Sequence, residues 1–574
     1  MKLTGAQIFW ECMQREGVEV VFGMPGGASI PIYDTLTEYN IHHVLVRHEQ
    51  GAAHMAEGYA RACGKVGVAM ATSGPGATNL VTGIANAMMD SIPTVFITAQ
   101  VNSKLIGFDA FQETDVTGIT LPITKHNYLV TDVKDIARTI HEAFYIARSG
   151  RPGPVLVDIT KDAQQNSTEY DSEKAHINLR GYRPNSQPVE SDIKKAVALI
   201  HAAKRPVILA GHGILQSGAM KEVLEYAERT QTPVAMTLMG LSGFPASHPL
   251  NLGMMGMHGE AWVNHAIQDA DLLLAFGMRF DDRVTGDLRR YATHARKIHI
   301  DIDPAEINKI VKVDVGIVGD LSQTLEKILM QVKPCNHQDW LNTINEIKGD
   351  SSVRDIKNLP DNGHLYAAHV INDLWNITGG EAVVVTDVGQ NQMWSAQYYK
   401  QDNPFQFISA GGLAPMGFAL PAAIGAKFAQ PEKEIWVIAG DGGFQMTQAE
   451  LSTAAQEGIK INVAILNNGY LGMVRQWQEF FYERRYSATT MKGPDFLKIA
   501  DAHGLTGMRV TTRADVENAI QTARETEGTV VIDFRVEKED SVYPMVPAGA
   551  ELKEMIRRPM QAAVSVENSV KVEA

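Results

Sequence analysis

One carboxylate and one amide in the second half of the chain stand where two strand-like segments end. The apolar run at residues 434–439 stops at Gly440-Asp441-Gly442, and the run at residues 461–466 stops at Asn467-Asn468. Carboxylate and amide oxygens suit hard cations of the Mg2+ class, which fill their other positions with water and substrate phosphates. The glycines let the backbone approach an anion, and a following helix would aim its N–H groups at it. The pattern therefore predicts a diphosphate held through a metal ion.

The elements around these residues decide whether they meet. Residues 446–456 have helical periodicity between the two apolar runs, so the stretch is interpreted as strand, turn, helix, strand and turn. In a right-handed parallel unit both turns fall at the carboxyl edge of the sheet, and we expect Asp441 and Asn468 to lie close together there. The alternative is that both residues only make turns, as Asp and Asn beside glycine usually do. Agreement of spacing and strand context at both ends favours the metal site.

A similar alternation of strand-like and helix-like segments runs through the whole chain and predicts three doubly wound α/β domains with parallel sheets. Polar sequence without periodicity at residues 166–190 and 333–363 predicts two linkers. The boundaries that we expect are a first domain at residues 1–170, a second at 190–335, a third at 360–550, and a C-terminal cap and tail at 551–574. The last ~15 residues are expected to be disordered. Three similar units suggest internal duplication.

Composition excludes several classes of protein. The 574 residues are too many for one core, and 45% apolar with 21% charged residues is typical of a soluble globular protein. The balance of 52 basic and 66 acidic residues, a net charge of −14, argues against nucleic acid as a partner. Three scattered cysteines fit a reducing compartment. The first residues lack the apolar core of a signal peptide, and no run reaches the ~18 apolar residues of a membrane span, so we expect a cytosolic protein.

A second carboxylate, Glu49, stands in the segment Arg47-His48-Glu49-Gln50, between a strand-like segment and a helix expected to open at about Gly51. On the residues alone, an acid at a helix start is usually a cap. Two further segments are distinctive: FDDRVTG at residues 280–286 and VRQWQ at residues 474–478.

Together with the Asp441 and Asn468 turns, these segments resemble the catalytic large subunit of the anabolic acetohydroxyacid synthases, also called acetolactate synthases. The resemblance covers about residues 3–560. It implies a pyrimidine-binding domain, a middle FAD-binding domain and a diphosphate-binding domain, with thiamine diphosphate, Mg2+ and FAD as cofactors. It also implies that Glu49 bonds to N1′ of the aminopyrimidine and promotes the imino tautomer, whose 4′-nitrogen takes the proton from thiazolium C2.

The resemblance assigns roles to residues throughout the chain. Catalytic roles fall to Glu49, Gln112 and Lys161, and substrate binding falls to Phe111, Arg283 and Trp477. Thiamine diphosphate would contact Gly27, Gln390, Asn391, Met416, Gly442 and Gly443, with Met416 propping the cofactor in a bent form. The metal would be held by Asp441, Asn468 and the backbone carbonyl of Tyr470. FAD would be bordered by Arg151, Met257, His258, Arg279, Asp301 and Asp320.

Several of these residues have a plainer interpretation without the resemblance. Arg283 would be a surface partner of Asp282, Trp477 part of an aromatic helix stripe, and Met416 a core residue. Asp301 and Asp303 stand at a strand end, where carboxylates can accept from ribose hydroxyls, although sheets that bind nothing show this too. Gly211-His212-Gly213 lacks the full dinucleotide-binding spacing, which argues against a standard site there.

The expected reaction is decarboxylation of pyruvate and transfer of the two-carbon unit to a second 2-oxo acid, giving 2-acetolactate or 2-aceto-2-hydroxybutanoate for branched-chain amino acid synthesis. Arg283 would bind the carboxylate of the second acid in two-pronged fashion, and Trp477 would favour 2-oxobutanoate over pyruvate. A flavin-dependent pyruvate oxidase is the alternative. A homodimer or dimer of dimers is implied, with a separate regulatory small subunit. The chain departs from the family at Met24, Asn391 and Ala414-Pro415, all near the expected cofactor.

Overall fold

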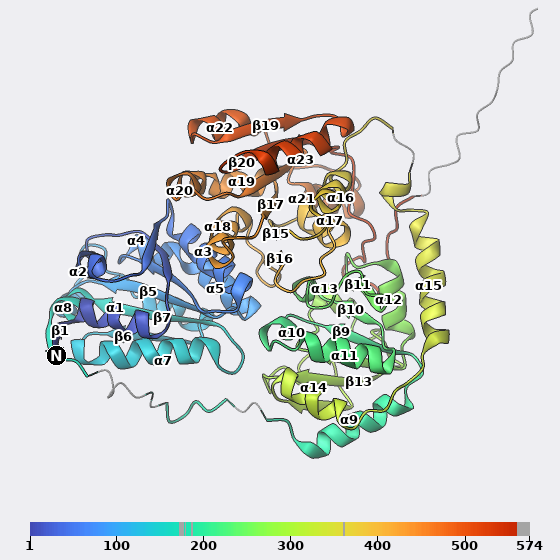
Figure 1. Ribbon diagram of the computed structural model, residues 1–574, viewed down its shortest axis with the longest axis horizontal. Helices are drawn as coiled ribbons and strands as arrows, with labels where there is room; N and C mark the ends of the chain where they lie inside the picture. The colour runs from blue at the N-terminus through green and yellow to red at the C-terminus, as the bar shows by residue number, and fades with distance from the viewer. Residues whose placement is uncertain (172–176, 178, 185–186, 360–361, 560–574) are drawn as a thin grey trace, which may run out of the picture.

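The computed structural model describes residues 1–171, 177, 179–184, 187–359 and 362–559 of the chain. It contains three six-stranded sheets, and every strand pairing within them is parallel. Figure 1 shows the first domain in blue, the middle domain in green below the third, and the third domain in orange and red. The prediction of three doubly wound α/β domains is confirmed. The disorder expected for the last ~15 residues concerns positions outside the described ranges.

The first and third sheets share one strand order. The strands of the first sheet, in spatial order, are β3 (His42–Leu45), β2 (Val20–Gly23), β4 (Gly67–Ala71), β5 (Thr94–Gln100), β7 (Pro154–Thr160) and β6 (His126–Val130). Those of the third are β16 (Phe407–Ile408), β15 (Val383–Thr386), β17 (Ile435–Gly440), β18 (Asn462–Asn467), β20 (Val530–Arg535) and β19 (Thr506–Val510). If the strands of each sheet are renumbered 1 to 6 along the chain, both orders become 2-1-3-4-6-5. The shared order supports internal duplication.

The middle sheet is wound differently. Its strands, in spatial order, are β11 (Asn251–Met254), β10 (Val234–Met236), β9 (Pro206–Ala210), β12 (Leu272–Phe276), β13 (Arg296–Asp301) and β14 (Val315–Val318). Renumbered in the same way, the order is 3-2-1-4-5-6. Sheets with this order bind dinucleotides in the crevice where the strand order reverses, which here lies between β9 and β12.

Helices cover both faces of each sheet, so the strands are buried on both sides; all seven residues of β5 and of β7 are buried. The first domain has α1 (Gly5–Arg15), α2 (Ile30–Thr35), α3 (Glu49–Cys63), α4 (Pro75–Asn79), α5 (Val81–Asp90), α6 (Val116–Thr120), α7 (Ile136–Arg148) and α8 (Lys161–Gln165). The middle domain has α9 (Glu190–Ala202), α10 (Gly213–Gln216), α11 (Met220–Thr230), α12 (Ala261–Asp269), α13 (Asp282–Thr285) and α14 (Leu321–Leu329). The third has α16 (Ala367–Thr378), α17 (Gln390–Tyr398), α18 (Ala419–Ala429), α19 (Asp441–Thr447), α20 (Leu451–Gln456), α21 (Gly472–Phe481), α22 (Phe496–Ala502) and α23 (Val516–Glu525).

Two further features tie the ends of the first domain together and join it to the third. The short strands β1 (Lys2–Thr4) and β8 (Ser167–Glu169) pair antiparallel and hold the chain start to the domain end. Helices α3 and α18 lie side by side where the blue and orange parts meet (Figure 1). Gly58 and Gly425 make this crossing possible, since a Cβ at either position would collide with the backbone carbonyl of Ala422 or Met55. Among the described residues, no helix is both long enough and apolar enough to span a bilayer.

Two local predictions were wrong. Residues 333–363 were expected to be an irregular linker, yet they contain α15 (Gln338–Ser352), which buries only Trp340 and Ile344 and therefore leaves almost no apolar period in the sequence. The helix expected at residues 446–456 begins five residues earlier, at Asp441, and a short 3-10 segment at 448–450 separates α19 from α20. The consecutive glycines at its start hide it, because glycine is a poor helix former.

Candidate active site

The carboxyl edge of the third sheet brings together the two turns that the sequence singled out. Strands β17 and β18 are neighbours in parallel register, with Gly440 opposite Leu466, so Asp441 and Asn468 both lie just beyond that edge. The backbone N–H of Asn468 lies near enough to the Asp441 carboxyl to lower its pKa. The two turns lie at one edge of the sheet, as expected.

Asp441 is buried, and its Oδ2 atom has no hydrogen-bond partner within the described part of the chain. Burial raises the pKa of this carboxyl to about 6, and the N–H groups of Asp441 and Asn468 oppose the rise. A buried carboxylate oxygen without a donor is costly unless a cation neutralises it. Asp441 therefore fits the role of a metal ligand.

The raised pKa of Asp441 has a consequence for the apoprotein. Because the folded state holds this proton more tightly than the unfolded state, its contribution to stability is greatest at low pH and is lost as pH rises through about 6. We expect Asp441→Asn to remove about 1 kcal/mol of the fall in unfolding free energy between pH 5 and 7. Urea denaturation of both apoproteins across this range measures the difference. Parallel pH profiles for the two proteins would contradict a raised pKa at Asp441.

The side chain of Asn468 is held by two neighbours. Its Oδ1 atom accepts a hydrogen bond from the backbone N–H of Tyr470 at 3.0 Å, and its Nδ2 group donates to Gln390 Oε1 at 3.3 Å. The amide oxygen predicted to bind the metal is thus already in one hydrogen bond. A carbonyl oxygen has two lone pairs, so this bond leaves one for a cation.

Three more residues predicted to contact thiamine diphosphate lie near the same edge. Gln390 and Asn391 open α17, directly after Gly389. Gln390 Nε2 donates to Gln476 Oε1 at 2.9 Å and to the Asp540 carbonyl at 3.2 Å, whereas Asn391 Oδ1 is buried without a partner among the described residues. Met416 lies beside the Asp441 turn, its Cε atom 3.4 Å from the position that a Cβ of Gly442 would take. The first turns of α17 and α19 both supply free N–H groups to an anion at this edge.

The sequence interpretation missed Asp387, which holds the loop after Met416 and packs against α19. Its buried carboxylate accepts the N–H groups of Gly417 and Ala419 at 3.1 Å, and it packs against Gly443, where any Cβ would collide with it. Burial raises its pKa, while the N–H groups of Val388, Gly417 and Ala419 lower it. Asp387 therefore fixes the loop that carries Met416. Asp387 directly follows a buried strand, and this position could have marked it in the sequence as a residue of the sheet edge.

A cavity of about 630 Å³ lies where the three domains meet, at the point of the middle sheet where the strand order reverses. The loops after β9 and β12, at Gly211-His212-Gly213 and Gly277-Met278, line it. All six residues predicted to border FAD also line it: Arg151, Met257, His258, Arg279, Asp301 and Asp320. The volume is within the range of ~300–1,000 Å³ that is typical of ligand sites. Gly211 and Gly213 line this cavity, although their spacing argued against a standard dinucleotide site.

The polar groups of this cavity differ in their hydrogen-bond partners and in the direction of their pKa shifts. Arg151 is held by Glu306 at 2.6 Å and by Ser91 Oγ at 2.8 Å. Burial raises the pKa of Asp301 to about 6, and one of its oxygens accepts the Asp303 N–H at 2.9 Å. Burial lowers the pKa of His258 to about 4, so its ring is neutral near pH 7. One oxygen of Asp320 caps α14 through the Gln323 N–H at 3.0 Å.

The two residues predicted to select the second substrate line the same cavity. The Arg283 guanidinium is 3.7 Å from Asp282 and 3.6 Å from Met257 Sδ, so its contact with the acid is loose and its donors remain available. Trp477, on α21, packs against Phe481 with ring centroids 5.1 Å apart and also faces the cavity. Trp477 therefore belongs to an aromatic stripe on its helix and also forms part of the cavity wall.

The residues predicted from the first domain form a separate group. Glu49 is the first residue of α3, is buried, and accepts a hydrogen bond from Asn79 Nδ2 at 2.9 Å. Lys161 Nζ donates to the Gly27 carbonyl at 2.9 Å. Gln112 has a φ of 61° and packs on the turn at Gly74, and its neighbour Phe111 is 88% exposed. Within the described ranges, none of Gly27, Glu49, Phe111, Gln112 and Lys161 lines the 630 Å³ cavity, although Arg151 of the same domain does.

The start of α3 instead meets a different part of the third domain of its own chain. The Glu450 carboxylate accepts the backbone N–H groups of Arg47 at 3.1 Å and His48 at 3.0 Å. A Cβ on Gly51 would collide with the same carboxylate. Within one chain, the start of α3 is thus held against Glu450, and among the described residues no hydrogen bond joins Glu49 to Asp441 or Asn468.

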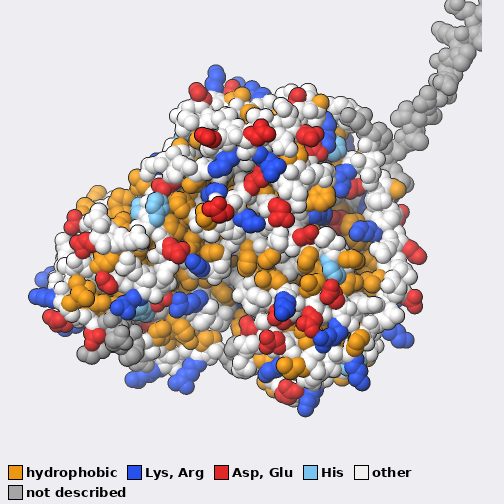
Figure 2. All heavy atoms as spheres, viewed as in Figure 1, with side chains coloured by type: hydrophobic (Ala, Val, Ile, Leu, Met, Phe, Trp, Pro, Cys, Tyr) orange, Lys and Arg blue, Asp and Glu red, His pale blue; other side chains and the backbone are white. Residues whose placement is uncertain are grey.

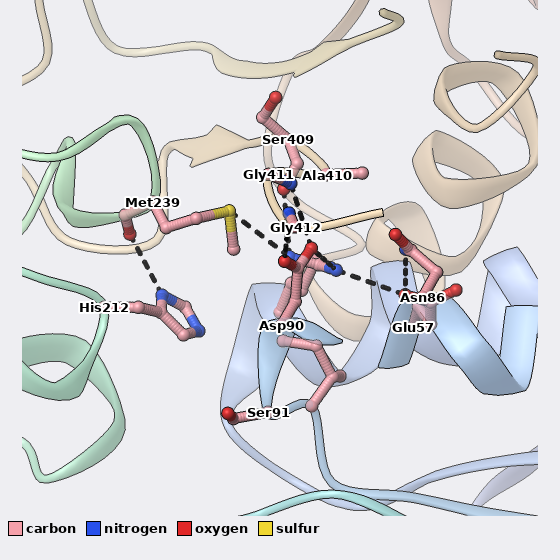
Figure 3. A network of polar contacts seen from close by, with 12 residues as sticks. Glu57, Asn86, Asp90, Ser91, His212, Met239, Ser409, Ala410, Gly411 and Gly412 are labelled. Carbon is pink, nitrogen blue, oxygen red and sulfur yellow. Dashed lines mark hydrogen bonds and ion pairs between the residues drawn. The ribbon is translucent and has the colours of Figure 1, made fainter. Parts of the chain in front are cut away.

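A buried ion network fixes how the domains meet at one wall of the cavity (Figure 3). The Asp90 carboxylate accepts the N–H groups of Gly411 and Gly412 at 3.0 and 2.6 Å, and it pairs with Arg61 at 2.7 Å. Arg61 in turn donates to the Ser409 carbonyl at 2.9 Å and lies against Met239 Sδ of the middle domain. Every charge here is paired, which is the condition under which burial of such a network is tolerated.

Comparison with known proteins agrees with this architecture. Three domain models of the thiamine pyrophosphate enzymes match: the N-terminal TPP-binding domain over residues 3–119, the central domain over 193–328 and the C-terminal TPP-binding domain over 387–534. An acetolactate synthase large subunit of Mycobacterium tuberculosis is 48% identical over 567 residues, covering 96% of this chain and 91% of that protein. The large subunit of Corynebacterium glutamicum is 48% identical, with 96% and 89% covered. An acetolactate synthase of Arthrospira platensis is 45% identical, with 97% and 98% covered.

Proposed function

This chain belongs to the acetolactate synthases of the thiamine pyrophosphate enzyme family, and we propose that it binds thiamine diphosphate through Mg2+ and FAD in the cavity between its domains. It forms 2-acetolactate from pyruvate in the first common step of branched-chain amino acid synthesis. The same site would form 2-aceto-2-hydroxybutanoate when 2-oxobutanoate is the second substrate. The observation that carries the cofactor assignment is the buried Oδ2 of Asp441 beside the Asn468 turn, an atom without a hydrogen-bond partner among the residues that the structure describes.

The residues at the third sheet fit a metal-bound diphosphate. Asp441, Asn468 and the Tyr470 carbonyl would hold Mg2+, and Gln390, Asn391, Gly442 and Gly443 would contact the diphosphate oxygens. Met416 would support the cofactor in its bent form. When bound, thiamine diphosphate supplies an acidic thiazolium C–H and an electron sink, which together allow pyruvate to lose CO2.

The first domain would supply the pyrimidine side. Glu49 would share a proton with N1′ of the aminopyrimidine, which makes the 4′-nitrogen basic enough to take the C2 proton. The Asn79 amide, which donates to one carboxylate oxygen of Glu49 at 2.9 Å, leaves the other oxygen for this contact. Gly27 would lie against the cofactor, Phe111 and Gln112 would close the substrate pocket, and Lys161 would stand at its mouth.

The cavity of the middle domain would hold FAD. Its strand order is the dinucleotide-binding one, and Asp301 and Asp320 offer carboxylate oxygens to ribose hydroxyls at the ends of two neighbouring strands. Arg151 and Arg279 supply positive charge for a pyrophosphate in a chain whose net charge is −14. The net reaction transfers no electrons, so FAD would have a structural role. For the same reason, and because the relatives are acetolactate synthases, a flavin-dependent pyruvate oxidase is not favoured.

Arg283 and Trp477 would select the second substrate from within this cavity. The planar guanidinium would bind the carboxylate of the incoming 2-oxo acid through two parallel hydrogen bonds and so orient its carbonyl. The indole face would pack on the extra methyl group of 2-oxobutanoate, a contact worth about 1–3 kcal/mol.

We therefore expect Trp477→Leu to lower the preference for 2-oxobutanoate over pyruvate by about tenfold while acetolactate synthesis continues. The ratio of the two products in competition, measured by chromatography, tests this. Phe480→Leu is the matched control, because Phe480 lies on the same helix but packs on Tyr543 instead of lining the cavity. Product ratios that change equally in both variants would remove Trp477 from the pocket.

A second copy of the chain would complete the site. Within the described part of one chain, no hydrogen bond joins Glu49 to the Asp441 and Asn468 turns, and the start of α3 is held against Glu450 instead. Exposed apolar side chains support an interface: Phe108 is 76% and Phe111 is 88% exposed, and Figure 2 shows hydrophobic side chains gathered where the first domain meets the rest of the molecule. We infer a homodimer or dimer of dimers in the cytosol. A separate small subunit would add regulation by branched-chain amino acids.

One assay tests the proposed function as a whole. Purified protein is incubated with pyruvate, thiamine diphosphate, Mg2+ and FAD, and the product is scored as acetolactate while the visible spectrum reports bound flavin. Acetolactate without oxygen uptake is the expected result. Oxygen or quinone consumption without acetolactate would establish the oxidase instead.

A further inference from the structure

A second cavity, of about 400 Å³, lies away from the residues assigned to the reaction. It is enclosed by α12 of the middle domain, the connecting helix α15, the chain just after α17, and the C-terminal segment near residue 557. In Figure 1, α15 runs along the outer side of the middle domain. The cationic side chains that line this cavity, called here the α15 cavity, are Lys348, Arg354, Lys357, Lys400, Arg557 and Arg558.

The charge of the α15 cavity is opposite to that of the protein. Glu260 and Asp355 are the acids that line it, against six cations, in a chain whose net charge is −14. Two acids outside the lining pair with its arginines: Asp350 with Arg557 at 2.9 Å and Asp540 with Arg558 at 2.7 Å. When these are counted, six cations still face four acids, so a surplus of two positive charges remains.

Several donors in the α15 cavity have no acceptor. Lys400 forms no hydrogen bond or ion pair with any described residue, and Glu260 is the acid whose charge raises its pKa most. Arg354 Nε and Gln401 Nε2 are buried and likewise have no partner in the described part of the chain. Buried donors that remain unpaired are rare in proteins and indicate a missing acceptor. An anion bound in the cavity would give Lys400, which lines it, the acceptor that it lacks among the described residues.

Three of the aromatic rings that line the cavity have a cation over one face. Lys348 lies over Trp262 at 5.5 Å, Lys357 over Tyr398 at 5.5 Å and Arg558 over Tyr543 at 5.0 Å. Recognition there must therefore depend on charge and hydrogen bonding more than on stacking. Tetrahedral dianions with several acceptor oxygens match a surplus of two charges and donors that converge from separate elements.

We propose that the α15 cavity binds a small molecule carrying a phosphate group, at a site separate from the thiamine diphosphate and FAD sites. Gln397 forms part of the partition between the two cavities: its Nε2 donates to the His258 carbonyl at 3.0 Å and to the Tyr543 carbonyl at 3.1 Å. The free Oε1 of Gln397 is a buried acceptor that a hydroxyl or amine of the ligand would fill. The volume suits a ligand of up to mononucleotide size.

Lys400 makes the proposal testable in the holoenzyme. Burial lowers the pKa of its ammonium group, so a larger share of Lys400 than of an exposed lysine is a neutral, reactive amine. The probe is pyridoxal 5′-phosphate, whose aldehyde condenses with a neutral amine with loss of water. Borohydride then reduces the imine to a stable secondary amine. Thiamine diphosphate, Mg2+ and FAD are kept at saturation so that their own phosphate sites are filled.

Peptide mass spectrometry compares the labelling of Lys400 with that of Lys194, an exposed lysine on α9. We expect Lys400 to be labelled about tenfold faster, and pyridoxal, which lacks the phosphate, to lose this advantage. Inorganic phosphate and ADP are each expected to slow labelling at Lys400 and not at Lys194. Protection by ADP at lower concentration than phosphate identifies a phosphate ester as the ligand class, and equal protection identifies the free anion.

Arg354→Met provides the variant, and Arg289→Met, at a fully solvated arginine on the middle domain, is its control. We expect Arg354→Met to raise the concentration of phosphate needed for protection about tenfold, with the control unchanged. Labelling of Lys400 no faster than that of Lys194, or labelling that neither anion slows, would overturn the proposal.

Discussion

Asp441→Ala is expected to abolish acetolactate synthesis, with kcat/KM falling at least ~10³-fold, which corresponds to about 4 kcal/mol. The carboxylate is the only charged side chain among the proposed metal ligands, and Mg2+ holds few protein ligands besides phosphate and water. Without it, the diphosphate loses its anchor in an acidic protein. Initial rates at saturating Mg2+ and cofactor measure the loss.

For the stability of the apoprotein, we expect the same variant to cause no loss, in contrast to its effect on activity. Because burial raises the pKa of Asp441 and its Oδ2 has no donor, its removal should leave the apoprotein at least as stable as the wild type. The wild type should gain about 2.7 kcal/mol from thiamine diphosphate and Mg2+ at a hundredfold excess over the dissociation constant, and the variant should gain almost nothing. Thermal unfolding with and without cofactor measures both. Asp501→Ala, at an exposed acid near the end of α22, should behave as wild type. A normal cofactor shift in Asp441→Ala would refute the metal assignment.

Glu49→Gln is expected to lower kcat by about 10²- to 10⁴-fold while cofactor binding is retained. Glutamine keeps the shape of the side chain and can still accept from Asn79, but it cannot share a proton with the pyrimidine ring. The readout specific to this role is proton exchange at C2 of the bound cofactor, followed by NMR after acid quench, which should slow in parallel with kcat. Glu38→Gln, at an exposed position, is the control. Unchanged C2 exchange in Glu49→Gln would leave Glu49 as a helix cap.

Mixing the two inactive variants tests whether the site is shared between chains. If Glu49 of one chain serves the Asp441 site of its partner, each mixed dimer contains one site in which both residues are intact. Random exchange of subunits in a two-fold dimer should then restore up to about a quarter of wild-type activity. No recovery after demonstrated exchange would mean that both residues act within one chain.

The site in the third domain was the easiest to predict from the sequence, because it depends on two strands that are neighbours both in the chain and in the sheet. Strands β17 and β18 are neighbours joined by one helical crossover, so the right-handed rule and the parallel register bring Asp441 and Asn468 to one edge without further information. The start of a helix within a run of glycines was harder to predict from the sequence. The glycines at the start of α19 have low helix propensity, and Gly443 packs on Asp387, a contact between segments more than fifty positions apart that the local sequence does not show.

Only the tertiary structure decided which distant residues share a cavity and which do not. Arg151, Met257 and Asp320 come from two domains, and no local period or turn relates them, yet they line one cavity because the middle sheet reverses its strand order where the first domain docks. The same docking, through the close crossing of α3 and α18 and the Asp90 network, holds the start of α3 against Glu450. The sequence by itself determined the chemical groups and the sheet edge that presents them. Their assembly depends on domain packing, which arises from contacts between surfaces that are far apart in the chain and leave no pattern along it.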